Sequence, residues 1–496
     1  MHPRLQKFLN WAGRKMVSSA TTIEDKQYLE YLINRWKASP VRIDQITGDR
    51  YYRGDHDILM RKRLASDGHG GQIEVKDLPN YRTVDNQFAK MVDQKSNFLF
   101  GQDVTVSCDD DNYLELLETI VNKDFDKTLS ELATASIIGG IAWLYVFYDE
   151  NGSISFRVIP SWQIMPIWKD SKHTELTAAV RVYEEVYFNG VREEIIDRVE
   201  VYKIDGIEKY VLVGGKLMPD DVYPKRAYLS VEIDGNETPL NWGKIPLIPF
   251  KANHTEIPLI KRCKSLQDGI NSILSTFQNN MEEDYRNTLL IVKNYDGQDL
   301  GELRRNIATY GIIKVRSIDG IDGGVDSLQV EVNAENYKSL LERLKRSLIS
   351  NCRGYDAAEL REGSGSSANE MNIKSVYSDI TIDSYEMESE YQFSLNELLW
   401  FINKYLGAST VEPVEWIFNR DTVVSESAVI NDIKNSVGIL SDETLIEQHP
   451  YVEDIKKELD RIAKQKSQDD IYARVFNDEQ TSDDEEEAPE EQQQEQ

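Results

Sequence analysis

Cysteine and histidine are scarce in this sequence of 496 residues, which contains three cysteines and six histidines. No two cysteines form a Cys-x-x-Cys pair, and no two histidines are spaced as His-x-x-x-His. The sequence therefore lacks the patterns of a disulfide scaffold and of a zinc site. Sparse cysteines are typical of a protein that folds in a reducing cytoplasm, and we expect neither a metal ion nor a cofactor.

Long apolar runs are missing too. The longest, such as residues 137–147, are much shorter than the roughly 20 residues that span a bilayer. Near the N-terminus, residues 8–12 form an apolar stretch that contains Asn10 and is too short for the core of a secretory signal. We therefore expect a soluble protein without a membrane partner.

Motifs of catalysis and nucleotide binding are absent as well. No Gly-x-x-x-x-Gly-Lys-Ser/Thr sequence occurs, so the chain does not resemble a P-loop ATPase. Residues 363–368 match Gly-x-Gly-x-x-Ala, but they follow a polar loop, whereas a dinucleotide site requires a preceding buried strand. Asp319, Asp322 and Asp326 miss the spacing of a calcium loop. We expect a protein that is not an enzyme.

Basic residues are fewer than acidic ones, with 57 against 86, and the net charge is −29. Residues 478–496 contain ten acidic and no basic side chains, which leaves −19 for the rest of the chain. Because tight DNA binding needs clustered Lys and Arg, this chain is suited to DNA only where strong attachment is unwanted. Residues 471–496 have too few apolar side chains to fold and are expected to be disordered.

The N-terminal half has the pattern of an α+β domain. Helical spacing of apolar residues occurs at 21–37, 81–101 and 112–138. Two aromatic and β-branched runs between 141 and 160 flank Asn151-Gly152, which predicts a β-hairpin. Further strand patterns follow at 178–188, 193–206 and 208–215. Residues 1–250 are thus expected to place helices first and an antiparallel meander after them.

A strand pattern at 242–250 contains Pro246 and Pro249. Proline lacks the N–H donor that a central strand needs, so this strand is expected at an edge of a sheet. We interpret it as the boundary of the first domain.

Two long apolar stripes come next, at 257–284 and 334–350, and predict a pair of packed helices. Between them, strands at 289–295, 311–317 and 328–332 and a helix at 299–310 predict a small β-α-β-β insert. The residues expected to pack the helical pair are Leu259, Cys263, Leu266, Ile270, Ile273, Phe277, Leu340, Leu341, Leu344 and Leu348.

The remaining chain begins with a polar Gly/Ser segment at 351–369. A helical pattern then runs over 369–405, and the weak helix formers at 379–383 predict a bend or break in it. Residues 410–420 have a strand pattern. A helical pattern over 421–466 is interrupted at 438–441 and at His449-Pro450.

This order of parts resembles the portal proteins of tailed bacteriophages, in particular the siphovirus family of Gram-positive hosts. The resemblance covers about residues 25–475. The stretches that carry it are 81–104, 241–253, 289–300, 321–332 and 441–462.

The resemblance implies a portal fold of named regions. They are an α+β wing at 1–250, stem helices at 251–284 and 334–350, an α/β clip at 285–333, a channel loop at 351–369, a long kinked helix with a return to the wing at 370–420, and a helical crown at 421–470. It also implies a dodecameric ring at one capsid vertex of the virion, through which double-stranded DNA passes during packaging and ejection. Assembly would take place in the host cytoplasm.

The resemblance also implies partners and site residues. The clip would dock the terminase large subunit and later the head-completion adaptor, and the ring would contact the major capsid and scaffolding proteins. The clip residues concerned are Lys293, Tyr295, Arg304, Arg305, Lys314 and Arg316. Those of the channel loop are Asn351, Arg353, Arg361, Ser364, Ser366, Ser367 and Asn369.

Several alternatives stay open at this point. The chain could instead be a cytoplasmic helical scaffold that forms no DNA channel, or an enzyme that binds phosphate at residues 363–368. The Gly/Ser segment could be a flexible linker without DNA contact. The basic segment 1–20 could be a frayed helix or an arm for capsid or scaffolding protein.

Overall fold

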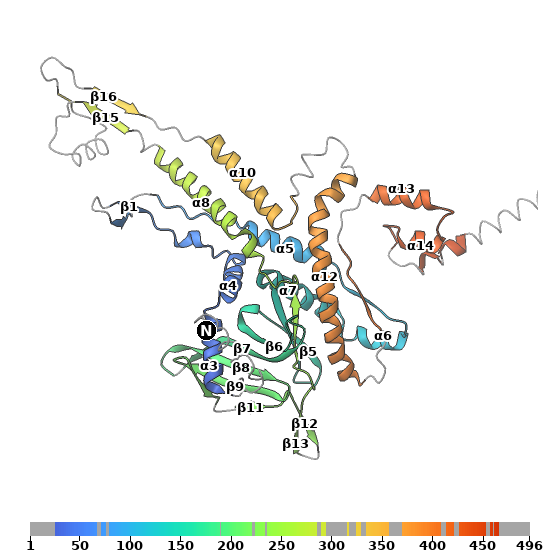
Figure 1. Cartoon of the computed structure of the whole chain (residues 1–496). Coiled ribbons are helices and arrows are strands. Elements are labelled where there is room, and N and C mark those ends of the chain that lie inside the picture. Colours follow the sequence, from blue (N-terminus) through green and yellow to red (C-terminus); the bar gives the residue numbers. More distant parts are fainter. Residues whose placement is uncertain are drawn as a thin grey trace, which may run out of the picture. The chain divides into compact units, whose positions relative to one another are not determined.

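The computed structural model describes most of the chain (Figure 1). The described residues are 25–66, 71–75, 79–188, 190–220, 224–233, 236–284, 289–293, 315–316, 324–328, 334–356, 370–407, 413–420, 426–452, 457–459 and 461–465. They form two compact units, one of Met1–Asp356 with Tyr377–Asp421 and one of Ala357–Val376 with Thr422–Gln496. The fold is α+β, as expected. No helix within the described ranges is long and apolar enough to cross a membrane.

An antiparallel meander occupies the first unit, as the sequence predicts, in the order β10-β9-β8-β7-β6. Its strands are β6 (Ile164–Trp168), β7 (Leu176–Phe188), β8 (Glu193–Lys203), β9 (Gly206–Val213) and β10 (Lys216–Pro219), with the short β11 (Lys225–Arg226) beside β9. Helix α3 (Lys26–Lys37) packs on one face through Leu29 and Ile33. Asp25 caps α3, since its side chain accepts a hydrogen bond from the backbone N–H of Gln27.

The predicted hairpin forms a second sheet with the proline-containing strand. Strands β4 (Ile141–Tyr148) and β5 (Ile154–Ile159) pair, and β14 (Leu247–Lys251) lies on the other side of β4. Pro249 therefore sits in an edge strand, which confirms the expectation from its missing donor. Shorter pairs join β1 (Leu64–Ser66) to β2 (Gln72–Glu74), β12 (Leu229–Ile233) to β13 (Asn236–Leu240), and β3 (Thr105–Ser107) to β17 (Glu415–Ile417).

The helices of the first unit include α4 (Pro40–Tyr52), α5 (Gln87–Phe100), α6 (Asp111–Glu118) and α7 (Lys123–Gly139). The single helix predicted at 112–138 is thus two helices. Asn122 explains the break, because its side chain accepts hydrogen bonds from the N–H groups of Asp124 and Phe125 and so begins α7. Gly140 ends α7 in the left-handed conformation.

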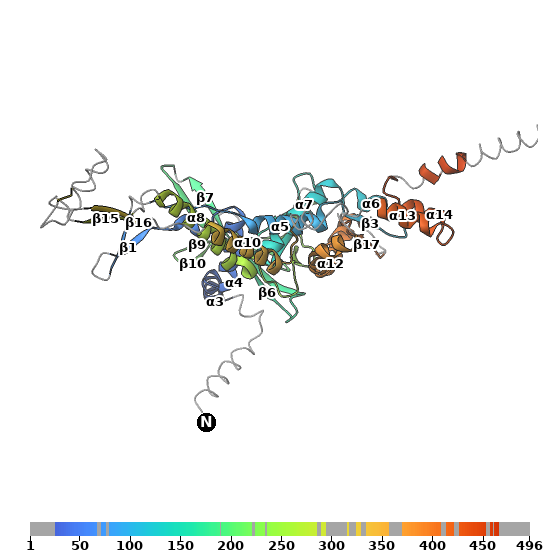
Figure 2. The same ribbon diagram turned by 90° about the horizontal axis from the view of Figure 1, so that it is seen from above.

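Helices α8 (Ile260–Asp284) and α10 (Ala334–Asn351) lie side by side, as Figures 1 and 2 show. Between them in the chain, β15 (Leu289–Lys293) pairs with β16 (Gly324–Leu328). The second of these strands begins within the segment predicted as a turn and includes Leu328, whereas residues 329–332 of the strand predicted at 328–332 lie outside the described residues. The predicted helix at 299–310 lies outside the described residues.

Helix α12 (Glu370–Leu406) is one uninterrupted helix, so of the predicted bend or break at 379–383 the break was wrong, whereas the bend stays a prediction. Ile380 is completely buried, and Thr381 and Ser384 donate hydrogen bonds to carbonyl oxygens one turn earlier. Tertiary packing therefore outweighs the weak helix propensity of this stretch.

A single apolar core joins these helices to the first domain predicted from the sequence. Phe88, Trp242 and Phe250 from residues 1–250 share one cluster with Ile270 of α8 and Tyr391 of α12. The core is thus continuous across the proline-containing strand.

The second unit includes α13 (Glu426–Ser436) and α14 (Asp442–Glu447). The predicted interruption at 438–441 is confirmed. Gly438 has a positive φ, and the Ser441 hydroxyl accepts a hydrogen bond from Thr444 N–H to begin α14.

Candidate functional site

The chain turns sharply where α10 ends and the predicted channel loop begins. The N–H of Gly354 donates to the carbonyl of Ile349, and that of Arg353 to the carbonyl of Ser350, both at 3.0 Å. This pair of bonds is a Schellman motif, in which glycine usually occupies the left-handed position. Here that position is Arg353, with φ of 52°. A non-glycine residue there costs roughly 1–2 kcal/mol, so surrounding contacts must stabilise the turn.

One such contact is a pair of hydrogen bonds from Gln94 of α5 to the backbone of Tyr355. The side-chain amide of Gln94 accepts a hydrogen bond from Tyr355 N–H and donates one to Tyr355 carbonyl oxygen, both at 2.9 Å. Gly354 allows this approach, since a Cβ there would lie 2.5 Å from the sulfur of Met91. The Tyr355 ring contacts that of Tyr377 on α12, with centroids 4.5 Å apart. Residues on both sides of the segment 357–369 are therefore held together.

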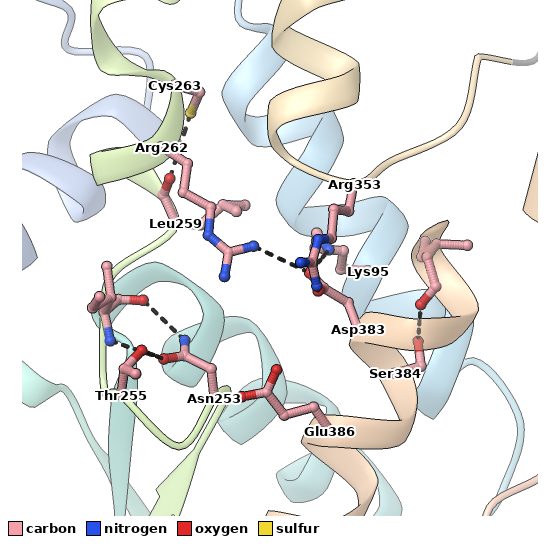
Figure 3. Close-up of polar contacts among 12 residues, drawn as sticks. Lys95, Asn253, Thr255, Leu259, Arg262, Cys263, Arg353, Asp383, Ser384 and Glu386 are labelled. Carbon is pink, nitrogen blue, oxygen red and sulfur yellow. Dashed lines mark hydrogen bonds and ion pairs between the residues drawn. The ribbon is translucent and has the colours of Figure 1, made fainter. Parts of the chain in front are cut away.

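A second contact is the carboxylate of Asp383 on α12, which meets three cations from three other parts of the chain (Figure 3). Its oxygens lie 2.7 Å from Lys95 Nζ, 2.6 Å from an Arg353 nitrogen and 3.4 Å from an Arg262 nitrogen. The side chains of Lys95 and Asp383 are only 9% and 17% exposed. We call these four residues the Asp383 cluster.

The charges in this cluster depend on one another. Burial alone would raise the pKa of the Asp383 carboxyl, but Lys95, Arg353 and Arg262 outweigh it and the pKa is lowered from its usual value. Burial lowers the pKa of Lys95, and Asp383 opposes that effect. The buried ammonium therefore relies on this carboxylate to remain charged.

A cavity of about 40 Å³ adjoins the cluster, lined in part by Lys95, Asn253, Arg262, Asp383 and Glu386. A volume of this size accommodates water but is far below the roughly 300–1,000 Å³ of a small-molecule site. Elsewhere within the described residues, no group of three or more His, Cys, Asp and Glu side chains is placed to hold a metal ion. The arrangement is suited to joining α5, α8, α10 and α12 mechanically.

Helix α8 carries a second polar feature that the sequence reading missed. Gln267, Asn271, Ser275 and Asn279 are at most 1% exposed and recur every fourth residue. They accept hydrogen bonds of 2.8–3.0 Å from the backbone N–H groups of Phe88, Asp85, Thr83 and Tyr81, in that order. We call this set the α8 ladder.

Geometry explains the spacing of the α8 ladder. Four residues advance a helix by about 6.0 Å, and two residues advance an extended chain by roughly 6.6 Å. Acceptors on every fourth residue of α8 can therefore meet alternate N–H groups of the segment 81–85. The i, i+4 polar spacing was visible in the sequence, but nothing local identified its partner.

Replacing Asn271 with Leu should destabilise the first unit by about 1–3 kcal/mol. Asn271 accepts from Asp85 N–H and Gln267, and its amide also meets a ring nitrogen of His56 at 2.8 Å. The change would leave these buried polar groups without partners. Urea unfolding followed by tryptophan fluorescence measures the effect, and Ser272→Leu, at an exposed position one residue along, should shift the midpoint little. Equal shifts for both variants would contradict the role of the α8 ladder.

The predicted site residues fall into different places. Leu259, Cys263, Ile270 and Leu348 are buried between α8, α10 and the core, and Leu266, Ile273, Phe277, Leu341 and Leu344 are half-buried. Leu340 differs, because it is 48% exposed. Its packing role stays a prediction.

Of the predicted channel-loop residues, Asn351 is exposed and Arg353 belongs to the Asp383 cluster. Arg361, Ser364, Ser366, Ser367 and Asn369 lie outside the described residues, as do Tyr295, Arg304, Arg305 and Lys314 of the predicted clip. Lys293 and Arg316 are described and exposed. Gln94, Lys95 and Asp383 were not predicted from the sequence.

Comparison with known proteins supplies a family. The family model "Phage portal protein, SPP1 Gp6-like" matches residues 29–472. The portal protein of Bacillus phage SPP1 is 27% identical over 463 residues, which cover 91% of this chain and 89% of that protein. The portal protein of Clostridium phage phiCD119 is 23% identical over 425 residues, covering 82% and 89%.

A solved structure described as "Neck of native GTA particle computed with C12 symmetry" is also similar. It has a TM-score of 0.36 and 12% sequence identity, and the match covers 73% of this chain and 89% of that one.

Proposed function

This chain belongs to the SPP1 Gp6-like family of phage portal proteins, and from that premise we propose how its parts serve a portal. It is a structural protein of the virion capsid and not an enzyme. It forms the DNA channel at the capsid vertex and takes part in DNA packaging. The family sets aside the scaffold and enzyme alternatives.

The proposed regions follow the order of the chain. They are the wing at 1–250, the stem at 251–284 and 334–350, the clip at 285–333, the channel loop at 351–369, the long helix and return to the wing at 370–420, the crown at 421–470, and the acidic tail at 471–496. The pairing of α8 with α10 around the β15–β16 insert supports the stem and clip. The uninterrupted α12 has no break, and its kink stays part of the proposal.

The stem helices support the proposal of a ring, and the number of twelve copies is proposed from the resemblance to portal proteins. One side of the α8–α10 pair packs into the core, whereas Met281 of α8 is 55% exposed and Leu340 of α10 is 48% exposed. In a ring, one side of the stem must pack within its own subunit. Another side must stay exposed so that it can contact a neighbouring subunit. An interface between unlike surfaces closes into a ring when its rotation divides a full turn.

The charge distribution supports a channel that binds double-stranded DNA weakly. The chain carries −29, and the guanidinium of Arg353 lies against Asp383 instead of standing alone. With 6 to 10 phosphate contacts, the affinity for DNA would change by roughly 10³–10⁵ over a modest change of salt concentration. Binding that rests on so many contacts is too tight for translocation. We infer that the channel loop steers DNA through small polar side chains.

The remaining partners are proposed from the regions. Lys293 and Arg316 are exposed in the clip, where the terminase large subunit would dock during packaging and the head-completion adaptor afterwards. The wing and crown would face the major capsid and scaffolding proteins.

Negative-stain electron microscopy and analytical ultracentrifugation of the full chain test this proposal. We expect ring-shaped particles with a central opening and twelve subunits, and weak retention of linear double-stranded DNA at about 0.15 M salt. Particles of only one or two chains at every salt concentration would refute the ring. Tight, salt-resistant DNA binding by intact rings would refute the weakly binding channel.

A further inference from the structure

A two-stranded ribbon projects from the large sheet of the first unit. Strands β7 and β8 pair along their length, from Ala179 with Tyr202 to Phe188 with Glu193. Strand β6 accompanies β7 only as far as Arg181, and β9 accompanies β8 only from Asp197 onward. Among the described residues, 184–188 and 193–196 therefore have no strand partner except each other. Isolated two-stranded ribbons are marginally stable in water, so a further covering element is expected.

One face of this ribbon continues the sheet face that α3 covers. Side chains alternate along a strand, so Val186 and Phe188 share a face with Val182, and Ile195 shares it with Val199. Val182 and Val199 lie buried beneath α3. The cover ends where Lys37, the last residue of α3, pairs with Asp197 at 2.7 Å.

Beyond that ion pair the same face is apolar and exposed. Val186, Phe188 and Ile195 are 64%, 62% and 70% exposed. Acidic side chains border them, since Glu184 and Glu193 lie on this face beside Val186 and opposite Phe188. An amphipathic helix with apolar and basic side chains would suit this face. Helix α3 covers the adjoining part of the sheet in the same way, with Lys37 as a basic side chain.

The chain itself supplies such a segment immediately before α3. Residues 1–23 contain Arg4, Lys7, Arg14 and Lys15 and no acidic residue. Within that range the apolar residues Leu5, Phe8, Leu9, Ala12 and Met16 follow helical spacing. Both its charge and its apolar stripe complement the exposed face of the ribbon.

The length of the connection also fits. Helix α3 has 12 residues and so spans about 18 Å, with its C-terminal end at the base of the ribbon. Residues 18–24 in extended form reach roughly 23 Å, enough to return along α3. We propose that residues 1–17 dock on the exposed face of the β7–β8 ribbon of their own subunit and complete the cover that α3 begins.

Hydrogen exchange of the full chain and of a variant lacking residues 1–17 tests this docking. Deletion should accelerate amide exchange at 184–188 and 193–196 by about tenfold, because the ribbon loses its cover. Exchange in α12, distant in sequence, should stay the same. The double variant Glu184→Lys, Glu193→Lys should reproduce the acceleration in the full-length chain. Unchanged exchange in both variants would overturn the proposal.

Cross-linking distinguishes the source of the segment. In a Cys108→Ser background, the pair Phe8→Cys and Phe188→Cys should react with a short bismaleimide to give a cross-link within one chain. The matched control is Phe8→Cys with Ile382→Cys, at an exposed position on α12, which should not react. A cross-link between two chains, or equal yields for both pairs, would overturn docking within the subunit.

Discussion

Replacing Leu348 with Asp should destabilise the first unit by about 4 kcal/mol or more and prevent ring formation. Leu348 is completely buried where α10 meets α8 and the core. The substitution removes a large apolar side chain and places a carboxylate without a partner in its position. Urea unfolding of the purified chain measures the stability, and negative-stain imaging measures assembly.

Leu340→Asp is the matched control, eight residues earlier on the same helix. Because Leu340 is 48% exposed, this change should alter the stability of the isolated chain by less than about 0.5 kcal/mol. If the proposed stem contacts its neighbour in a ring, the variant should nevertheless assemble poorly. Normal rings from Leu340→Asp would remove this residue from the interface, and normal stability of Leu348→Asp would contradict the α8–α10 packing.

Replacing Asp383 with Ala should cost about 3–5 kcal/mol, the typical effect of breaking a buried ion pair from one side. Lys95 would remain buried without its carboxylate, and Arg353 would lose the ion pair that opposes the strain of its left-handed backbone. The residues at the base of the channel loop, 353–356, should become more mobile as a result. We call these residues the loop base. Thermal unfolding reports the stability, and hydrogen exchange at 353–356 reports the loop base.

Two comparisons isolate the role of the Asp383 cluster. Asp379→Ala, one turn earlier on α12 and exposed, should change stability little. The double variant Asp383→Ala, Lys95→Met should be more stable than Asp383→Ala alone, because it no longer buries an unpaired ammonium. Equal effects of Asp383→Ala and Asp379→Ala would contradict the cluster.

The same cluster predicts a dependence on pH. The pKa of Asp383 is lowered in the folded protein, so its contribution to stability is fully present above the unfolded pKa of about 3.9. That contribution is lost as the pH falls through the lowered folded value. Asp383→Ala should therefore flatten the acid side of the stability curve of the first unit.

Patterns within a few residues were sufficient for the regular elements. The apolar stripes of α8 and α10 predicted both helices and their pairing, and Asn151-Gly152 predicted the β4–β5 hairpin. The prolines near β14 predicted its edge position. Local patterns were misleading where contacts from other elements opposed them. In α12, such contacts hold weak helix formers in the helix.

The sequence by itself determined the α+β class, the order of the elements, the helical pair with its insert and the resemblance to portal proteins, because periodicity, turn residues and charge act over short stretches of chain. Only the tertiary structure decided how the loop base is built. Lys95 and Asp383 are 288 positions apart, and Gln94 and Tyr355 are 261 apart. No local pattern marks such partners, since their attraction arises only when folding removes them from water and brings them within hydrogen-bonding distance.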